Sequence, residues 1–147
     1  MDTPLHKAAI EGHLDIYQMI IPNLHDKNPR NYGGFTPLHI AAEHGHSEIC
    51  WVVEENPKSD LVSMVAINNF FKVENLKNAS GDTPLHKATI NGHLEVFSLV
   101  TSRIQNINPR NYEGFTPLHF AAGYGNLSIC QYMIKMEILF GGARIPK

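Results

Sequence analysis

Thr3-Pro4-Leu5-His6 is the stretch that decides the fold, because the same tetrapeptide returns at residues 36–39, 83–86 and 116–119. Successive copies begin 33, 47 and 33 residues apart. A period of this size is typical of one small structural unit that is used repeatedly along a chain. The sequence therefore predicts a repeat protein rather than a single globular core.

The tetrapeptide suits the start of a helix. Thr is a favourable N-cap because its hydroxyl accepts a hydrogen bond from a first-turn amide, and Pro fits the first helical position. Six residues after each His comes a glycine that can adopt the left-handed conformation ending a helix; these are Gly12, Gly45, Gly92 and Gly125. Each copy therefore predicts a short capped helix, a glycine turn and a second helix.

Apolar residues recur at helical spacing in both predicted helices. In the first repeat we expect a helix near residues 4–11 that buries Leu5, followed by a second helix whose buried stripe is Ile16, Met19 and Ile20. The other copies carry equivalent apolar residues, so the same pair of helices is expected four times.

Two irregularities organise the chain further. The step between the second and third copies exceeds 33 by 14 residues, within an apolar stretch that favours an extended or additional helix over a flexible linker. Residues 28–42 match 108–122, and residues 2–8 match 82–88, at an offset of 80. The chain therefore has the pattern of a duplicated two-repeat block.

These residues resemble the ankyrin repeat. The family's Thr-Pro-Leu-His-x-Ala stands at residues 3–8 and in three further copies, and its Gly-His follows in three of them, while Gly125-Asn126 departs from it. The resemblance implies an all-α solenoid of four stacked helix-turn-helix repeats with projecting finger loops and an insertion after repeat two. The expected ranges are 1–137 for the domain, about 1–27, 28–60, 75–107 and 108–137 for the repeats, 57–74 for the insertion and 138–147 for a tail.

Composition argues against several classes of protein. A net charge of −2 and a pI near 6.5 disfavour a nucleic-acid partner. No signal peptide is visible, and the apolar runs are too short for membrane insertion. Two cysteines 80 residues apart favour a reducing intracellular setting, cytoplasmic or nuclear. We expect a monomer whose outer repeats expose apolar surface unless further repeats cover them.

Little in the sequence points to chemistry. Of nine histidines, seven follow the repeat pattern, which assigns them to helix capping and hydrogen bonds between repeats rather than to a metal. Cys50 and Cys130 occupy equivalent apolar places and are expected to be buried and inert. No nucleophilic triad, acid–base pair or phosphate-binding loop is visible. We therefore expect neither an enzyme nor a cofactor.

The resemblance also implies where a partner would bind. In this family the finger tips and the outer side of the first helices form a concave surface, and aromatic and Arg side chains are common anchors of interfaces. Phe35 and Phe115 have an alternative role, which is packing on the neighbouring finger. The candidate partner-binding residues are Arg30, Tyr32, Phe35, Glu43, His44, Arg110, Tyr112, Glu113, Phe115 and Tyr124.

Two functions are compatible with these residues. The first is a scaffold or adaptor that binds a partner protein, and the alternative is a regulatory or anchoring segment of a larger enzyme, channel or ubiquitin-ligase adaptor. The resemblance further implies possible hydroxylation at Asn28, Asn75 and Asn108, because asparagines at this position are modified in the family.

Overall fold

The computed structural model describes residues 1–54 and 76–140, and within these ranges the chain forms helices and loops without a strand. The helices come in pairs joined by a short turn. Pair 1 is α1 (Pro4–Glu11) with α2 (Leu14–Ile20), pair 2 is α3 (Pro37–His44) with α4 (Ser47–Glu54), pair 3 is α6 (Pro84–Ile90) with α7 (Leu94–Thr101), and pair 4 is α8 (Pro117–Gly123) with α9 (Leu127–Phe140). A 3₁₀ turn, η1 (Ile21–Asn23), follows α2.

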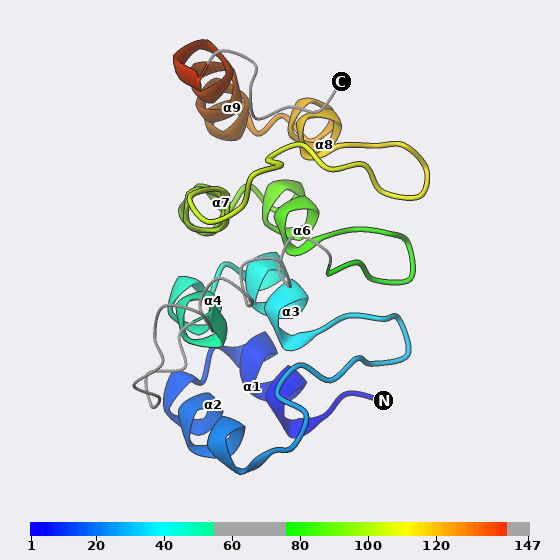
Figure 1. Cartoon of the computed structure of the whole chain (residues 1–147), viewed down its shortest axis with the longest axis vertical. Helices are drawn as coiled ribbons and strands as arrows, with labels where there is room; N and C mark the ends of the chain where they lie inside the picture. The colour runs from blue at the N-terminus through cyan, green and yellow to red at the C-terminus, as the bar shows by residue number, and fades with distance from the viewer. Residues whose placement is uncertain (55–75, 141–147) are drawn as a thin grey trace.

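The pairs stack in chain order into an elongated array (Figure 1). The first helices α1, α3, α6 and α8 form one column, in which each contacts the next, and the second helices form a parallel column beside it. Long loops project from the other side of the first-helix column, away from the second helices. The array therefore has the layout expected of a repeat protein.

Each first helix begins directly after its Thr, as the sequence predicts. Thr3, Thr36, Thr83 and Thr116 are the N-caps, and Pro occupies the first helical position. The His three residues further on completes a reciprocal capping box with the Thr in all four copies. The imidazole here accepts a hydrogen bond from the N-cap backbone amide, as a Glu or Gln side chain does in the usual capping box.

Where another pair follows, the glycine after a first helix is required for two reasons, as Gly45 illustrates. Its φ is +79°, a left-handed conformation that side chains disfavour. A Cβ added there would also lie 2.6 Å from Nδ1 of His93, which belongs to the next pair. The glycine therefore both ends its helix and admits a side chain from the neighbouring pair.

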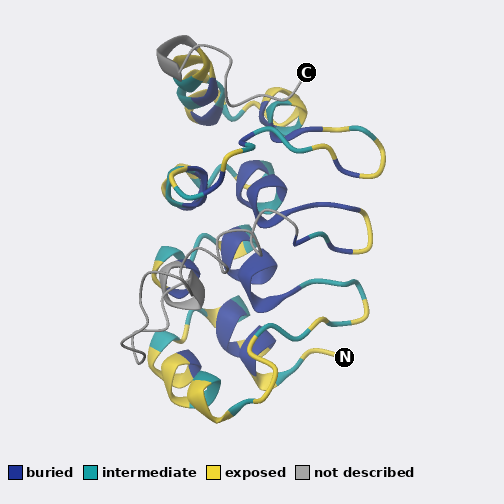
Figure 2. Cartoon of the chain, in the orientation of Figure 1, coloured by how far each residue is buried: buried dark blue, intermediate teal, exposed yellow. Residues whose placement is uncertain are grey.

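The core lies between successive pairs. Leu5, Leu38 and Leu85 are 1% exposed or less, and within the first-helix column α3 and α6 are largely buried (Figure 2). In the second-helix column a large and a small side chain alternate at equivalent positions, since Tyr17 is followed by Cys50 and then by Phe97, all fully buried. This alternation lets adjacent helices interdigitate without voids.

The predicted buried stripe of α2 is wrong at two positions. Ile16 is 43% exposed and Met19 is 67% exposed, whereas Tyr17 is the buried side chain of this helix. The reason is that pair 1 has no preceding pair among the described residues. Where a pair does precede, the residue equivalent to Ile16 is at most 1% exposed, as at Ile49, Val96 and Ile129.

The predicted insertion at 57–74 lies outside the described residues. At the other end, α9 continues to Phe140, past the expected repeat boundary at residue 137, and residues 141–147 of the expected tail also lie outside the described part of the chain.

Candidate binding surface

Three of the projecting loops are built on one asparagine each. In finger 4 (residues 110–115) the side-chain oxygen of Asn111 accepts hydrogen bonds from the amides of Glu113 and Phe115, at 3.1 and 2.9 Å. The Asn111 backbone amide donates to the Phe115 carbonyl at 2.9 Å, which closes the turn. Finger 2 (30–35) and finger 3 (77–82) repeat this arrangement around Asn31 and Asn78.

Neighbouring fingers are joined through their backbones. The Ala79 amide donates to the Gly33 carbonyl at 2.9 Å, and the Tyr112 amide donates to the Ser80 carbonyl at 3.1 Å. These bonds fix the spacing of the finger tips, so any partner meets a row of fingers held in register.

The basic side chains of the fingers form hydrogen bonds within and between the fingers. Arg30 donates to the carbonyls of Gly34 and Lys77, which binds finger 2 to finger 3. The Lys77 ammonium in turn donates to the Arg110 carbonyl at 3.0 Å. Arg110 donates to its own Gly114 carbonyl at 2.8 Å. Both guanidinium groups thus hold finger geometry, although Arg30 and Arg110 remain exposed.

Four of the predicted aromatic side chains are strongly exposed. Tyr32 is 92% exposed, Tyr112 69%, Tyr124 61% and Phe115 45%. Tyr112 is positioned by its neighbour, because the Lys77 ammonium lies 5.2 Å from its ring centroid. Rings held in place this way lose little conformational entropy when they bind a partner.

Phe120 extends the aromatic group on pair 4. It lies between two predicted residues, with ring centroids 6.0 Å from Phe115 and 6.3 Å from Tyr124. Sequence reasoning missed Phe120 because its position is not aromatic in the other repeats, where Lys7, Ile40 and Lys87 stand.

Phe35 behaves differently from its counterpart Phe115. Its ring is half-buried, and the Lys87 ammonium lies 4.9 Å from the ring centroid. Lys87 also pairs with Asp82 at 3.4 Å, and Asn111 donates to the same carboxylate at 2.9 Å. This favours the packing role for Phe35. Lys87 could not be picked out from the sequence, because its partner ring belongs to another repeat.

Glu43 and His44 stand at the end of α3. The Glu43 carbonyl accepts hydrogen bonds from Asn91 at 2.6 Å and from His93 at 3.0 Å, so its backbone is part of the contact between pairs 2 and 3. His44 is exposed and its ring stacks on His46, with centroids 6.2 Å apart. Glu113 is also exposed, at the tip of finger 4. Each of these three side chains lies on or beside the first-helix and finger surface.

The tetrapeptide histidines are structural, as predicted. Nδ1 of His39 accepts from the Thr36 amide at 3.2 Å, and its Nε2 lies 3.0 Å from the Asp82 carbonyl of the next pair. Since a carbonyl only accepts, Nε2 carries the proton, and the ring is neutral. His6 and His86 make the same bonds to the carbonyls of Phe35 and Phe115.

The surroundings favour the neutral form. Burial lowers the pKa of His39 to about 4 and also lowers the pKa of His86, because the charged ring would lose its hydration. Within the described residues, His, Cys, Asp and Glu side chains do not gather in threes that could hold a metal ion.

The cysteines do not form a reactive site. Cys50 is fully buried and burial raises the pKa of its thiol to about 12, which disfavours the nucleophilic thiolate. Cys130 is half-buried, and both thiols are free. The burial predicted for both cysteines is confirmed for Cys50, whereas Cys130 is only partly buried.

The candidate hydroxylation sites stand before the fingers. Asn28 and Asn108 are half-buried, and the Asn108 side-chain oxygen lies 3.4 Å from the Leu118 amide. Asn75 lies outside the described residues.

In the ranges 1–54 and 76–140, no helix is both long and apolar enough to span a bilayer.

The tetrapeptides, paired helices and linked fingers define a class of repeat protein, and comparison with known families identifies it. A family model described as ankyrin repeats (three copies) matches residues 1–64 and 51–141. The chain belongs to the ankyrin-repeat family, which confirms the resemblance and the all-α fold class.

Curated relatives share a short stretch with this chain. Protein phosphatase 1 regulatory subunit 12A from Mus musculus is 39% identical over 54 residues, which are 37% of this chain and 5% of the relative. A probable E3 ubiquitin-protein ligase from Oryza sativa subsp. japonica is 47% identical over 49 residues, 33% of this chain and 9% of the relative. A transient receptor potential cation channel subfamily A member 1 homolog from Caenorhabditis elegans is 39% identical over 56 residues, 37% of this chain and 5% of the relative. The matched region thus spans a tenth or less of each of these proteins.

Proposed function

We propose that this chain is a protein-binding module of four ankyrin repeats, with an insertion after the second, that grips a partner protein with its fingers and the adjoining face of its first helices. Ankyrin repeats are protein-interaction modules. The observation that supports this surface most strongly is the row of exposed aromatic side chains on fingers that are tied together by hydrogen bonds. Large rings on a rigid support are the usual anchors of a protein interface.

The candidate residues divide into two groups under this proposal. The contact group is Tyr32, Tyr112, Phe115 and Tyr124, with the exposed side chains of His44 and Glu113 beside them. Arg30, Arg110 and Phe35 already make side-chain contacts within the array, so their main task is to hold the surface in shape, whereas Glu43 contacts pair 3 through its backbone carbonyl. None of these residues is placed to carry out catalysis.

The test is an affinity capture with matched variants. Replacing Tyr32, Tyr112 and Tyr124 together by Ala should remove the captured partner while the helical circular dichroism stays unchanged, since all three rings are exposed. Met19→Ala is the control, because Met19 is equally exposed but lies on a second helix. Capture that survives the triple replacement, or that is lost in the control, contradicts the proposed surface.

A second candidate function is that the array regulates or anchors a larger protein of which it is one part. The relatives support it, because they are named as a phosphatase regulatory subunit, a ubiquitin-protein ligase and a cation channel, and the matched stretch is a small fraction of each. Sequencing the full-length transcript tests this candidate. A reading frame with further domains would support it, and one that ends at Lys147 would contradict it.

Hydroxylation of Asn28, Asn75 and Asn108 is proposed on the family resemblance. Asn28 and Asn108 are half-buried, so an oxygenase would need the segment before the finger to open. Mass spectrometry after exposure to an intracellular asparagine hydroxylase should show one added oxygen on these residues, and an unchanged mass would dismiss the proposal.

A further inference from the structure

The two ends of the array expose positions that are buried between pairs elsewhere. We call the side of a pair that faces the next pair its back face, and the side that faces the preceding pair its front face. At the back face of pair 4, His119 and Ala122 are exposed. Their counterparts in the other pairs are fully buried; these are His6, His39, His86, Ala9, Ala42 and Thr89. Ile134 is 51% exposed, and its counterpart Thr101 is fully buried. At the front face of pair 1 the same is true of Ile16, as described above. Each end is therefore one half of the contact that joins successive pairs.

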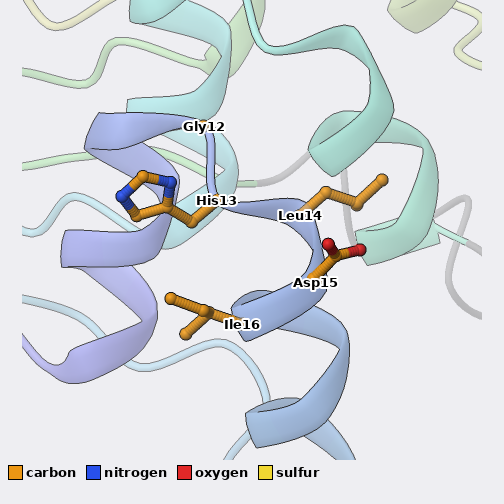
Figure 3. Close-up of a pocket in the computed structure, with 5 residues that line it drawn as sticks. All are labelled: Gly12, His13, Leu14, Asp15 and Ile16. Carbon is orange, nitrogen blue, oxygen red and sulfur yellow. The ribbon is translucent and has the colours of Figure 1, made fainter.

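An open hollow lies at the turn between α1 and α2, lined by Gly12, His13, Leu14, Asp15 and Ile16 (Figure 3). His13 and Ile16 point to one side of this turn, and Leu14 and Asp15 point to the other. The counterparts of His13 inside the array are bridging groups: Nε2 of His46 bonds the Ile10 carbonyl, and Nε2 of His93 bonds the Glu43 carbonyl, each at 3.0 Å. His13 occupies the position from which these two rings reach the preceding pair, and it is exposed.

The back face of pair 4 has space for such an imidazole. A Cβ added to Gly12, Gly45 or Gly92 would meet a side chain of the next pair within 3.0 Å, because an imidazole or amide sits against each glycine. At Gly125 nothing lies within 4 Å of that point, although its φ of +73° is the same as in the other three. Gly125 therefore offers open space for an incoming imidazole.

The contact between pairs 2 and 3 shows what would fit this back face. The finger and first helix of pair 4 repeat those of pair 2 over residues 108–122 and 28–42, and residues 2–8 of pair 1 repeat residues 82–88 of pair 3, at an offset of 80 residues. The second helices of pairs 2 and 4 share only their Ile-Cys. Between pairs 2 and 3, His39 bonds the Asp82 carbonyl at 3.0 Å and Lys87 covers the Phe35 ring at 4.9 Å.

The same two contacts can form between copies. The residues that correspond to His39 and Phe35 on pair 4 are His119 and Phe115, and Phe115 is 45% exposed. Those that correspond to Asp82 and Lys87 on pair 1 are Asp2 and Lys7, and the Lys7 side chain is 69% exposed. The pieces of one internal contact are therefore present on opposite ends of the chain.

We propose that the back face of pair 4 binds the front face of pair 1 in a second copy of this chain, head to tail. His119 would donate to the Asp2 carbonyl, His13 would enter the space beside Gly125 and bond the Gly123 carbonyl, and Lys7 would cover Phe115. Such a contact is heterologous, so it extends copies into an open array rather than closing a symmetric dimer. This proposal replaces the expectation of a monomer. Of the residues proposed to contact a partner it uses Phe115, and it leaves Tyr32 and Tyr112 on the fingers free.

Sedimentation velocity over a wide range of concentration tests the proposal with two blocked variants. Ile16→Glu blocks the front face and Ala122→Glu blocks the back face, and both sites are exposed, so the fold should be retained. The wild-type chain should form a concentration-dependent series of species. Each variant alone should associate about tenfold or more weakly, because its new carboxylate would be buried without a partner. Mixed together, the two variants should form a 1:1 complex, because each keeps one intact face.

Ser80→Glu, which places the same charge on the exposed tip of finger 3, is the control and should associate like the wild type. A wild-type chain that stays monomeric throughout would overturn the proposal. Self-association that survives in both blocked variants, or a mixture that forms no 1:1 complex, would also overturn it, since the contact would then lie elsewhere. Unchanged circular dichroism in each variant confirms that folding is not the cause.

Discussion

The ring of His39 takes part both in a helix cap and in a contact between two helix pairs. Its Nδ1 caps the start of α3, and its Nε2 bonds the Asp82 carbonyl of pair 3. The cap bond needs an unprotonated Nδ1, because protonated Nδ1 could no longer accept from the Thr36 amide, whereas Nε2 donates to the Asp82 carbonyl in either state. A single proton would therefore remove one bond of the helix cap and place a charge in the buried contact between pairs.

Acid should destabilise the array through this histidine. Its folded pKa of about 4 lies below the unfolded value of 6.5, so the unfolded chain binds more protons between these values and stability falls as pH falls. Full stability from this group is present above the unfolded pKa, and His39 alone should cost about 2 kcal/mol between pH 7 and pH 5. Urea unfolding at the two pH values measures the loss.

His39→Gln should make the pH dependence shallower, because it removes the titrating ring. His25→Gln, at an exposed site outside these hydrogen bonds, is the matched control and should keep the wild-type dependence. A pH dependence that is identical in all three proteins would show that the neutral ring does not control acid stability.

At the scale of helices, the glycine turns couple the end of one helix to the packing of the next pair. Gly45 and Gly125 share a left-handed φ, but only Gly45 has a side chain of the next pair against it. Substitutions at the two positions therefore separate the cost of a left-handed backbone from the cost of a steric clash with the next pair. At most helix ends the two costs act together.

Gly45→Ala should destabilise the protein more than Gly125→Ala. Gly125→Ala adds only the left-handed strain of a side chain, about 1–2 kcal/mol. Gly45→Ala adds the displacement of the His93 ring, whose Nδ1 lies 2.6 Å from the new Cβ. Thermal or urea unfolding measures both, with Gly123→Ala, inside α8, as the control expected to be neutral or stabilising. Equal losses at Gly45 and Gly125 would mean that the His93 contact contributes nothing.

For the whole molecule, stability follows from the contact of each pair with its neighbours. In such arrays the free energy of unfolding is approximately a sum of pair and contact contributions. α3 and α6 are covered on both sides, whereas pairs 1 and 4 each have one covered face among the described residues. The ends should therefore open before the middle.

Hydrogen exchange should show this gradient along the chain. Amides of α3 and α6 should exchange most slowly, and amides of α2 and α9 should exchange most rapidly, because local opening at an end breaks contacts with one neighbour only. The comparison should be made at low protein concentration, where end-to-end association would not protect α2 or α9. Uniform protection across all pairs would contradict an array of nearest-neighbour contacts and indicate one cooperative unit.

Much of the binding surface could not have been predicted from the sequence. Tyr32 and Tyr112 were found because aromatic residues in turns are not needed by the repeat, and both are exposed. Arg30 and Phe35 looked equivalent to them, yet one donates to the Lys77 carbonyl and the other lies beneath Lys87. Each of those partners is about 50 residues away in the chain, so no local pattern reveals it.

The sequence by itself determined the repeating unit: capped first helices after Thr3 and its copies, and left-handed glycine turns. These depend on φ preferences and on hydrogen bonds within three or four residues, which a short motif contains. Only the tertiary structure decided that Ile16 and Ala122 are exposed while their counterparts are buried, because burial depends on whether another pair lies alongside. Identical motifs therefore make identical helices, and the position of each in the stack decides which of its side chains are free to bind.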